Sequence, residues 1–141
     1  MKYLLDTTVI SDFVRGHPGV HQRLLRCAPA ELAVSAVTVM ELEYGLARNA
    51  ALAARVRPVV EALLQQITIL PCGEAEARET GRLRGELSRA GKPIGPFDAL
   101  IAGTARSHRL IVVTSNLSEF RRVPGLSVED WREFQVHEAD A

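Results

Sequence analysis

The sequence predicts an α/β fold in which a parallel central sheet of four to five strands is flanked by helices. Short apolar runs such as Tyr3–Leu5 and Leu110–Thr114 lack the polar alternation of half-exposed strands, which is typical of strands buried on both faces of a sheet. These runs alternate with segments of helical periodicity, as in doubly wound sheets. Because the chain has no internal repeat, linker or low-complexity segment, we assign residues 1–141 to a single domain.

The first third of the chain predicts two strands and two helices. The turn residues Gly16-His17-Pro18-Gly19 separate the two helices, and we expect Leu24 and Leu25 to face inward from the second. The predicted elements are a strand over residues 3–5, a helix over 8–15, a helix over 20–27 and a strand over 32–35.

The rest of the chain predicts a helical pair followed by further strands and helices. Pro58 indicates a kink or break in the second helix of the pair, and Gly91 is a stop signal for the next helix. That next helix is highly charged, which is typical of a solvated face, with an RNA-facing edge as the alternative. The predicted elements are helices over residues 38–49 and 50–66, a strand over 67–70, helices over 74–90 and 97–108, a strand over 110–114 and a last strand around 126–128.

Composition narrows the class of protein. Apolar residues make up 47% of the chain and charged residues 24%, which excludes a disordered or membrane protein. No apolar run approaches the roughly 18 residues of a spanning helix, and no basic stretch leads into an apolar signal core, so we expect a cytoplasmic protein that does not associate with membranes. Cys27 and Cys72 are isolated, which predicts neither a disulfide nor a zinc site.

The charge balance gives no clear partner. With 17 acidic and 17 basic residues the net charge is zero, so the chain lacks the strongly basic signature of many nucleic-acid-binding domains. Nearly all the basic residues are Arg, whose planar guanidinium group can donate two hydrogen bonds to one phosphate. An Arg-rich and Ala-rich chain is equally explained by the base composition of a genome.

Acidic side chains follow the predicted strands. Asp6 ends the first strand, Glu41 lies one turn into the helix after the second, Asp98 lies in the first turn of a helix, and Asn116 follows the strand over 110–114. Ligands of α/β sheets bind at this edge, although an Asp such as Asp6 also caps helices. Clustered acids repel unless a cation lies among them. Oxygen ligands favour Mg²⁺ or Mn²⁺, and such ions act most often on phosphates.

At these residues the chain resembles PIN-domain ribonucleases, and it is most similar to the VapC toxins of bacterial toxin–antitoxin pairs. The resemblance covers nearly the whole chain, in the order of the family's motifs. The matching segments are Leu5–Ser11, Ser35–Leu42 with Tyr44-Gly45, Ile94–Ala102, and Val113–Asn116 with Glu119-Phe120 and Val123–Leu126. The resemblance implies a PIN-like α/β fold, a Mg²⁺-dependent endoribonuclease, a homodimer, and a VapB-like antitoxin that binds it in a hetero-oligomer.

The resemblance also implies which residues act. Asp6, Glu41 and Asp98 fall on the family's three acidic positions. Asn116 stands where the family often has a further Asp, which leaves a second metal site open. Glu119 then either supplies the missing charge or is a surface residue.

The mechanism that we expect is hydrolysis of an RNA phosphodiester by a metal-activated water. In this mechanism Asp6 and Asp98 hold the principal Mg²⁺, Glu41 holds or orients the water, and Asn116 completes the metal pocket. Supporting donors would fix the carboxylates; the candidates are Thr7, Thr8 and Ser115, of which Thr8 replaces the Asn or Ser common in the family. Glu43 falls on no motif position, and we expect it to point elsewhere.

Other functions remain open from the sequence. A phosphatase or phosphotransferase with an acid after its first strand would usually have a second Asp where this chain has Thr8, and a late Lys. A response-regulator receiver needs an Asp after its third strand, where this chain has Pro71-Cys72. Among PIN proteins, a housekeeping RNA-processing nuclease and a non-cleaving RNA-binding or partner-binding module are the alternatives.

The helices over residues 38–66 carry more apolar residues than one small sheet needs to cover them. We therefore expect these helices to form a groove that takes the helical tail of the antitoxin. A basic side chain of that tail reaching the acids would inhibit the enzyme. The apolar residues are Val39, Leu42, Leu46, Val59, Val60 and Leu63.

Overall fold

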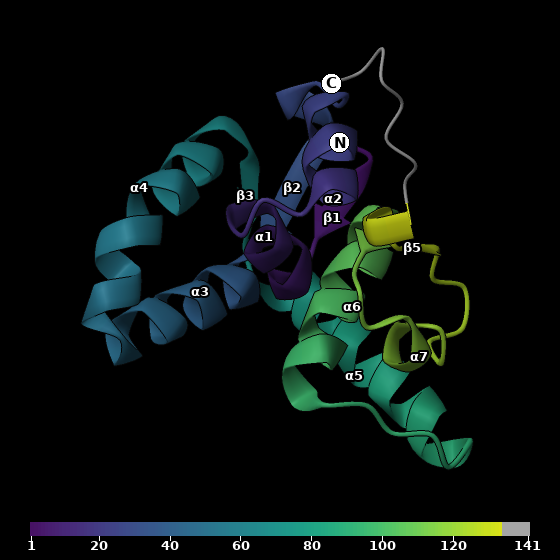
Figure 1. The fold of residues 1–141 in the computed structure, drawn as a ribbon. Coiled ribbons are helices and arrows are strands. Elements are labelled where there is room, and N and C mark those ends of the chain that lie inside the picture. The colour runs from purple at the N-terminus through teal and green to yellow at the C-terminus, as the bar shows by residue number, and fades with distance from the viewer. Residues whose placement is uncertain (134–141) are drawn as a thin grey trace.

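The computed structural model describes residues 1–133 as an α/β fold (Figure 1). Residues 134–141, which the predicted domain includes, lie outside the described part. The strands are β1 (Tyr3–Leu5), β2 (Leu32–Ser35), β3 (Thr68–Leu70), β4 (Ile111–Val113) and β5 (Val128–Glu129). The α-helices are α1 (Thr7–Val14), α2 (Pro18–Leu25), α3 (Ala36–Arg48), α4 (Ala50–Gln66), α5 (Glu74–Arg89), α6 (Pro96–His108) and α7 (Leu117–Phe120), with 3₁₀ turns η1 (Pro29–Glu31) and η2 (Trp131–Glu133).

The five strands form one parallel sheet in the order β3-β2-β1-β4-β5, which confirms the predicted sheet. The first strand of the chain therefore lies at the centre. In its register with β4, Leu5 lies beside Val113, so the residues that follow the two strands are neighbours. This pairing sets the geometry of the carboxyl edge.

Helices cover both faces of the sheet, and successive residues of β1 point to opposite faces. Leu4 packs with residues of α5 and α6, whereas Tyr3 and Leu5 pack with residues of α1, α2 and α4. Figure 1 shows α5 and α6 on one side of the sheet and α1 and α2 on the other. Burial on both faces explains why the strand sequences show no polar alternation.

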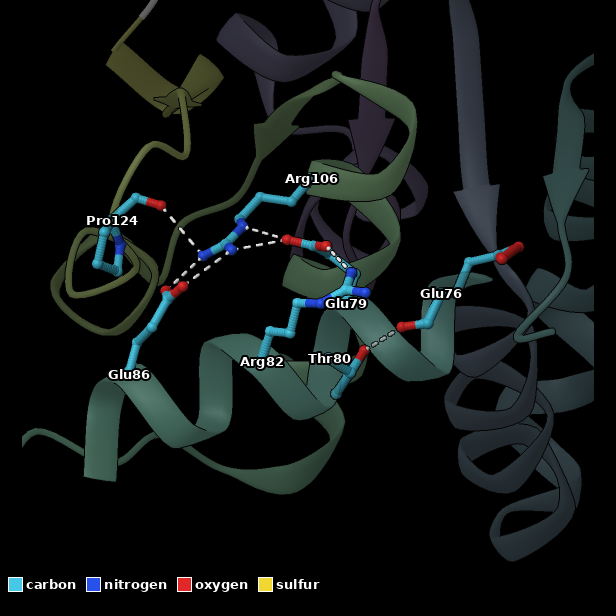
Figure 2. Close-up of polar contacts among 7 residues, drawn as sticks. All are labelled: Glu76, Glu79, Thr80, Arg82, Glu86, Arg106 and Pro124. Carbon is cyan, nitrogen blue, oxygen red and sulfur yellow. Dashed lines mark hydrogen bonds and ion pairs between the residues drawn. The ribbon is translucent and has the colours of Figure 1, made fainter. Parts of the chain in front are cut away.

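Close packing and ion pairs fix α6, the helix that carries Asp98, to α5. A Cβ on Gly103 would lie 2.0 Å from Thr80 Oγ1, so only glycine allows this approach. Arg106 binds Glu79 and Glu86 of α5 at 2.6 and 2.8 Å, and it also donates to the carbonyl of Pro124 (Figure 2). The small residue at position 103 thus allows α6 to pack closely against α5.

The helical pair α3 and α4 extends away from the sheet (Figure 1). The helix α4 continues through Pro58, so the predicted break is absent from it. Arg57 of α4 binds both carboxylate oxygens of Glu43 at 2.9 and 3.1 Å, which confirms that Glu43 points away from the acidic positions. The pair is therefore joined by its own ion pair near its outer surface.

The helices α1, α2, α3 and α6 each begin one or two residues earlier than predicted, and in α1 and α3 the side chain of the preceding residue caps the earlier start. The side chain of Asp6 accepts a hydrogen bond from the Val9 N–H, and the Ser35 hydroxyl accepts from the Val37 and Thr38 N–H groups. The expectation that Leu25 faces inward is wrong. Leu24 is buried, but Leu25 is 64% exposed, since consecutive residues of a helix point about 100° apart.

Two expectations about the chain as a whole concern the membrane and the cysteines. No helix within residues 1–133 is long and apolar enough to cross a membrane. Cys27 and Cys72 are both free.

Candidate active site at the carboxyl edge of the sheet

Asp6 is the most buried acid of the predicted site, with 2% of its surface exposed. Its Oδ1 accepts hydrogen bonds from the Val9 N–H at 3.1 Å and the Thr8 hydroxyl at 2.6 Å, and its Oδ2 accepts from the Thr114 hydroxyl at 2.5 Å. Burial raises the pKa of Asp6, while these hydrogen bonds lower it in part. Asp6 is thus a helix cap, as the alternative interpretation held, and it also lies within a network of hydroxyl donors.

Thr114 is a member of this network that the sequence reasoning missed. Its hydroxyl donates to Asp6 and accepts from the Asn116 N–H at 2.9 Å. The signal was present, because Thr114 is the polar end of the clearest strand, but its contact with Asp6 depends on β4 lying next to β1. Ser115 contributes through its backbone, whose N–H donates to the Thr8 hydroxyl at 3.0 Å.

Glu41 comes to the same edge from α3. The Thr7 hydroxyl donates to Glu41 Oε1 at 2.7 Å, across 34 residues of sequence. Thr7 and Thr8 therefore lie on two sides of the start of α1, one against Glu41 and the other against Asp6. Both threonines contact carboxylates, as expected of supporting donors.

Asp98, Asn116 and Glu119 form the third part of the site. The side-chain amide of Asn116 donates to Asp98 Oδ2 at 3.2 Å and to Glu119 Oε2 at 2.7 Å. Glu119 Oε1 accepts from the N–H of Gly95, the residue before α6, at 2.6 Å. Glu119 is thus drawn into the site by two donors rather than lying free on the surface.

The acids of the site change one another's pKa values. Burial and contact with Glu119, together with the charges of Asp6 and Glu41, raise the pKa of Asp98 to about 7. A hydrogen bond with Asp98 and the donors Gly95 and Asn116 hold the pKa of Glu119 below its usual range. The four carboxyl groups therefore occupy one neighbourhood, in which Asp98 keeps its proton more readily than a free carboxyl does.

The oxygen atoms of these side chains suit a hard cation, but the side chains are not arranged as a preformed metal site. Within residues 1–133, no three acidic, histidine or cysteine side chains are gathered into a ready-made metal site. The carboxylates are turned instead toward hydroxyl and amide donors. Their oxygen chemistry and mutual repulsion fit a divalent cation such as Mg²⁺, and the residues that could hold it are Asp6, Glu41, Asp98 and Asn116, with Glu119 beside them.

A cleft of about 610 Å³ begins beside Glu41 and Thr7 and continues between α1, α3 and α4. Leu42, Leu46 and Val60 line it, as the predicted groove required. The other predicted residues lie elsewhere: Val39 and Leu63 pack with the core, and Val59 is exposed. The cleft also has a wall that the sequence did not predict, because α1 contributes Ser11, Val14 and the adjoining Arg15.

Comparison with known proteins places these features in a family. The sequence profile of the PIN domain matches residues 3–126, which include all the acids described above. The chain belongs to the PIN-domain family. Its relatives within that family are VapC ribonucleases, so the resemblance seen in the motifs is confirmed.

Two relatives illustrate the similarity in sequence. The chain is 40% identical over 131 residues to the tRNA(fMet)-specific endonuclease VapC of Shigella flexneri, covering 93% of this chain and 98% of the relative. It is 37% identical, with the same coverage, to Ribonuclease VapC2 of Haemophilus influenzae. The match extends over nearly the full length of both relatives, so this PIN-domain chain is a VapC-type ribonuclease.

Solved structures show the same fold. A chain of the DNA-bound VapBC complex from Salmonella typhimurium superposes with a TM-score of 0.85 at 38% identity, covering 93% of this chain and 98% of that chain. A chain of VapBC2 from Rickettsia felis, bound to a DNA fragment from its promoter, gives 0.84 at 29% identity, with 93% and 99% covered. These neighbours are toxin–antitoxin assemblies, and they confirm the PIN fold predicted here.

Proposed function

We propose that this chain is the endoribonuclease toxin of a VapBC-type pair and that it hydrolyses RNA phosphodiesters with Mg²⁺. The observation that carries the proposal is the meeting of Asp6, Glu41 and Asp98 at the carboxyl edge, where burial and Glu119, with the charges of Asp6 and Glu41 added, raise the pKa of Asp98 to about 7. Folding alone gives no reason to bring these acids together. A nuclease that binds a divalent cation gives one.

Each acid has a distinct role in this proposal. Asp6 and Asp98 would hold Mg²⁺, which when bound lowers the pKa of a water and stabilises the charge that develops on the phosphate. Glu41 has one oxygen fixed by the Thr7 hydroxyl, which leaves its other oxygen to accept a hydrogen bond from the attacking water. Thr8 and Thr114 hold the Asp6 carboxylate from both sides and fix its direction.

Glu119 supplies the charge that Asn116 lacks. The amide of Asn116 donates to Glu119 and to Asp98 together, so the Asn–Glu pair presents one carboxylate where the family often has Asp at position 116. We assign Asn116 and Glu119 to the outer side of the metal pocket. Whether they complete a second metal site is decided by the stoichiometry of Mn²⁺ binding.

The partner in this proposal is a VapB-like antitoxin. The Salmonella typhimurium and Rickettsia felis neighbours are VapBC complexes, and the cleft beside Glu41 is lined by aliphatic residues suited to a helix. A basic antitoxin side chain that pairs with Glu41 would block the site. The predicted homodimer and the cytoplasmic location belong to the same proposal.

Cleavage of defined RNAs by the purified chain tests the proposal. Since the Shigella flexneri relative is named for tRNA(fMet), that tRNA is compared with an elongator tRNA, each in Mg²⁺ and in EDTA. We expect cleavage in Mg²⁺ only, and loss of cleavage in Glu41→Gln. Glu43→Gln is the matched control, because Glu43 is two residues away on the same helix and pairs with Arg57.

Two results would contradict the proposal. Cleavage in EDTA would exclude the role of the metal, and a Glu41→Gln variant as active as the parent would exclude the site. Induced expression separates the toxin from a housekeeping nuclease: the toxin arrests growth, and co-expression of the protein encoded beside it relieves the arrest.

A further inference from the structure

We infer that Phe97 and Tyr44 are stacking platforms for two unpaired bases of the RNA substrate, and that Arg122 binds a phosphate of the same strand. This inference rests on the proposed function, and it deepens it by naming the residues that select the nucleotides beside the cut. The substrate must be unpaired where it enters the site, because a base inside a duplex has both of its faces covered.

The exposed aromatic side chains lie beside the acids. Of the aromatic residues within residues 1–133, only Phe97 and Tyr44 are exposed, at 48% and 60%. Phe97 directly precedes Asp98 at the start of α6, and Tyr44 lies three residues after Glu41 on α3. Residues three apart on a helix are neighbours on its surface. Each exposed aromatic residue is therefore next to one acid of the proposed active site.

Packing within the fold does not account for these two rings. Neither core cluster of residues 1–133 includes Phe97 or Tyr44. Other aromatic residues, such as Tyr3 and Trp131, are buried and pack against each other. The Tyr44 ring lies 4.8 Å from the guanidinium of Arg48, measured to the ring centre, and more than half of the residue stays exposed. Both rings are thus available to cover the face of a base.

Arg122 supplies a positive charge at the same edge. Its Nη1 donates to the carbonyl of Pro93 at 2.8 Å, and its side chain makes no other hydrogen bond within residues 1–133. Together with the hydrogen bond from Asp98, its charge helps to hold the pKa of Glu119 below its usual range. The guanidinium is therefore fixed within electrostatic reach of the site, and its other N–H groups remain available to a phosphate.

An aromatic ring beside an available guanidinium matches a nucleotide better than a second copy of this chain. Single strands are bound through stacking on aromatic side chains and through basic groups that contact the phosphates. An interface between copies usually buries about 800 Å² on each side. Among the residues that flank Glu41 and Asp98, the exposed large apolar ones are Met40, Tyr44 and Phe97. Three side chains provide only part of that area.

Removing a ring and a base from the same contact is the first test. The probe is the tRNA that the parent cleaves, made with an abasic nucleotide at either position flanking the cut. Binding is measured in the Glu41→Gln background, in which the RNA stays intact. We expect Phe97→Leu and Tyr44→Leu each to weaken binding about tenfold. An abasic nucleotide should weaken binding by the parent to a similar degree, with no further loss in the variant whose ring contacts that base.

Matched variants control for changes elsewhere in the fold. Phe97→Tyr keeps the ring and should bind as the parent does. Leu25→Ala removes another exposed apolar side chain, 64% exposed on α2, and should leave binding unchanged. All the replaced side chains are exposed, so each variant should melt close to the parent.

Fluorescence of the RNA gives a readout that does not depend on cleavage. We expect 2-aminopurine at the flanking position that Phe97 covers to be quenched on binding, because stacking quenches its emission. Phe97→Leu should remove the quenching, and Phe97→Tyr should keep it.

The phosphate contact is tested through salt. Arg122→Met should weaken tRNA binding and lower the slope of log affinity against log salt by about one. Arg109→Met is the matched control, because Arg109 is also exposed but follows the far end of α6 from Asp98. It should leave the slope unchanged.

The outcomes separate the inference from the proposed function. If the parent cleaves no RNA, the proposed function fails, and the inference fails with it. If the parent cleaves RNA but the losses from ring and base multiply at both flanking positions, the inference alone is overturned. If Phe97→Leu or Tyr44→Leu converts a dimer into a monomer in analytical ultracentrifugation and leaves the quenching intact, the rings form an interface between copies, and the inference is wrong.

Discussion

Two groups of acids in this molecule differ in how their charge is balanced. Glu79 and Glu86 flank Arg106, whose contact holds the pKa of both carboxyls below their usual range (Figure 2). At the carboxyl edge of the sheet, Asp98 faces Glu119 and Asn116, no basic side chain within residues 1–133 pairs with it, and its pKa is raised to about 7. The first group is complete, because its charge is balanced within the fold. The second group is incomplete, and under the proposed function a bound cation would balance its charge.

The largest effect is expected from Asp98→Asn, which removes one charge from the incomplete group. Cleavage should fall roughly 1,000-fold, because the variant loses a metal contact whose contribution to the transition state is several kcal/mol. At pH 8 in chelator the variant should melt at or above the parent, since a repelled carboxylate is gone. In Mg²⁺ the order should reverse, because saturation at 100 Kd stabilises the parent by about 2.7 kcal/mol and the variant by less.

A structural role for Asp98 gives a different result. The variant would then be less stable by a similar amount in both buffers, and residual cleavage would follow the folded fraction. Melting curves in EDTA and in Mg²⁺, read beside the cleavage rates, separate these outcomes. Equal destabilisation in both buffers with cleavage retained would exclude Asp98 from the metal site.

The next largest effect is expected from changing Arg106, which balances the charge of Glu79 and Glu86. Arg106→Met should lower the free energy of unfolding by about 1–3 kcal/mol, because Glu79 and Glu86 lose a largely buried partner and are left close together. Arg82→Met is the matched control: Arg82 also binds Glu79, but it is 65% exposed and should cost under about 0.5 kcal/mol. Urea denaturation measures both, and equal costs would show that Arg106 has no special role.

The two groups should also shift stability with pH in opposite directions. The folded protein binds a proton at Asp98 more tightly than the unfolded chain does, so this group makes the metal-free protein less stable as pH rises from about 4 to 7. Glu79 and Glu86 have lowered pKa values, so their contribution is present above the unfolded pKa and is lost as pH falls through the folded value.

Unfolding measured from pH 3 to 8 in chelator checks this contrast. Asp98→Asn should make the decline above pH 4 shallower, with the remainder due to Asp6, whose pKa is also raised, and it should leave the acid side unchanged. Arg106→Met should flatten the acid side and leave the decline in place. A single variant that altered both limbs would mean that the two groups are coupled through α6.

Sequence alone predicted the fold, and the acids that it singled out lie near one another at the carboxyl edge of the sheet. It failed where strand order and side-chain direction matter. Buried runs such as Tyr3–Leu5 predicted the parallel sheet because strands covered on both faces have few polar residues. The contact between Thr114 and Asp6 could not be predicted in the same way. It spans 108 residues and exists only because β4 pairs with β1 in one register.

The cleft shows the same limit. The apolar content of α3 and α4 predicted a groove, and Leu42 and Leu46 indeed line it. The α1 wall was missed, since the position of α1 against α3 and α4 follows from tertiary packing rather than from local periodicity. Leu25 was misassigned for a local reason, because two consecutive helical residues cannot both face one core.

The smallest effect is expected from changing Thr8, one of the two threonines whose hydroxyls donate hydrogen bonds to the Asp6 carboxylate. Thr8 donates to Asp6 Oδ1 and accepts from the Ser115 N–H, so Thr8→Val removes both contacts while keeping the shape of the side chain. We expect a cost of about 1 kcal/mol in the free energy of unfolding and a further rise in the Asp6 pKa, since burial would meet less hydrogen bonding. Thr8→Ser is the matched control: it keeps the hydroxyl and should cost under about 0.5 kcal/mol.

Mn²⁺ binding at pH 6 and pH 8 provides the second measurement, in which Thr8→Val should lose more affinity at pH 6 because protons compete better for Asp6. If Thr8→Val matched Thr8→Ser in stability and in Mn²⁺ affinity at both pH values, the hydroxyl would have no part in holding Asp6 ready for the metal.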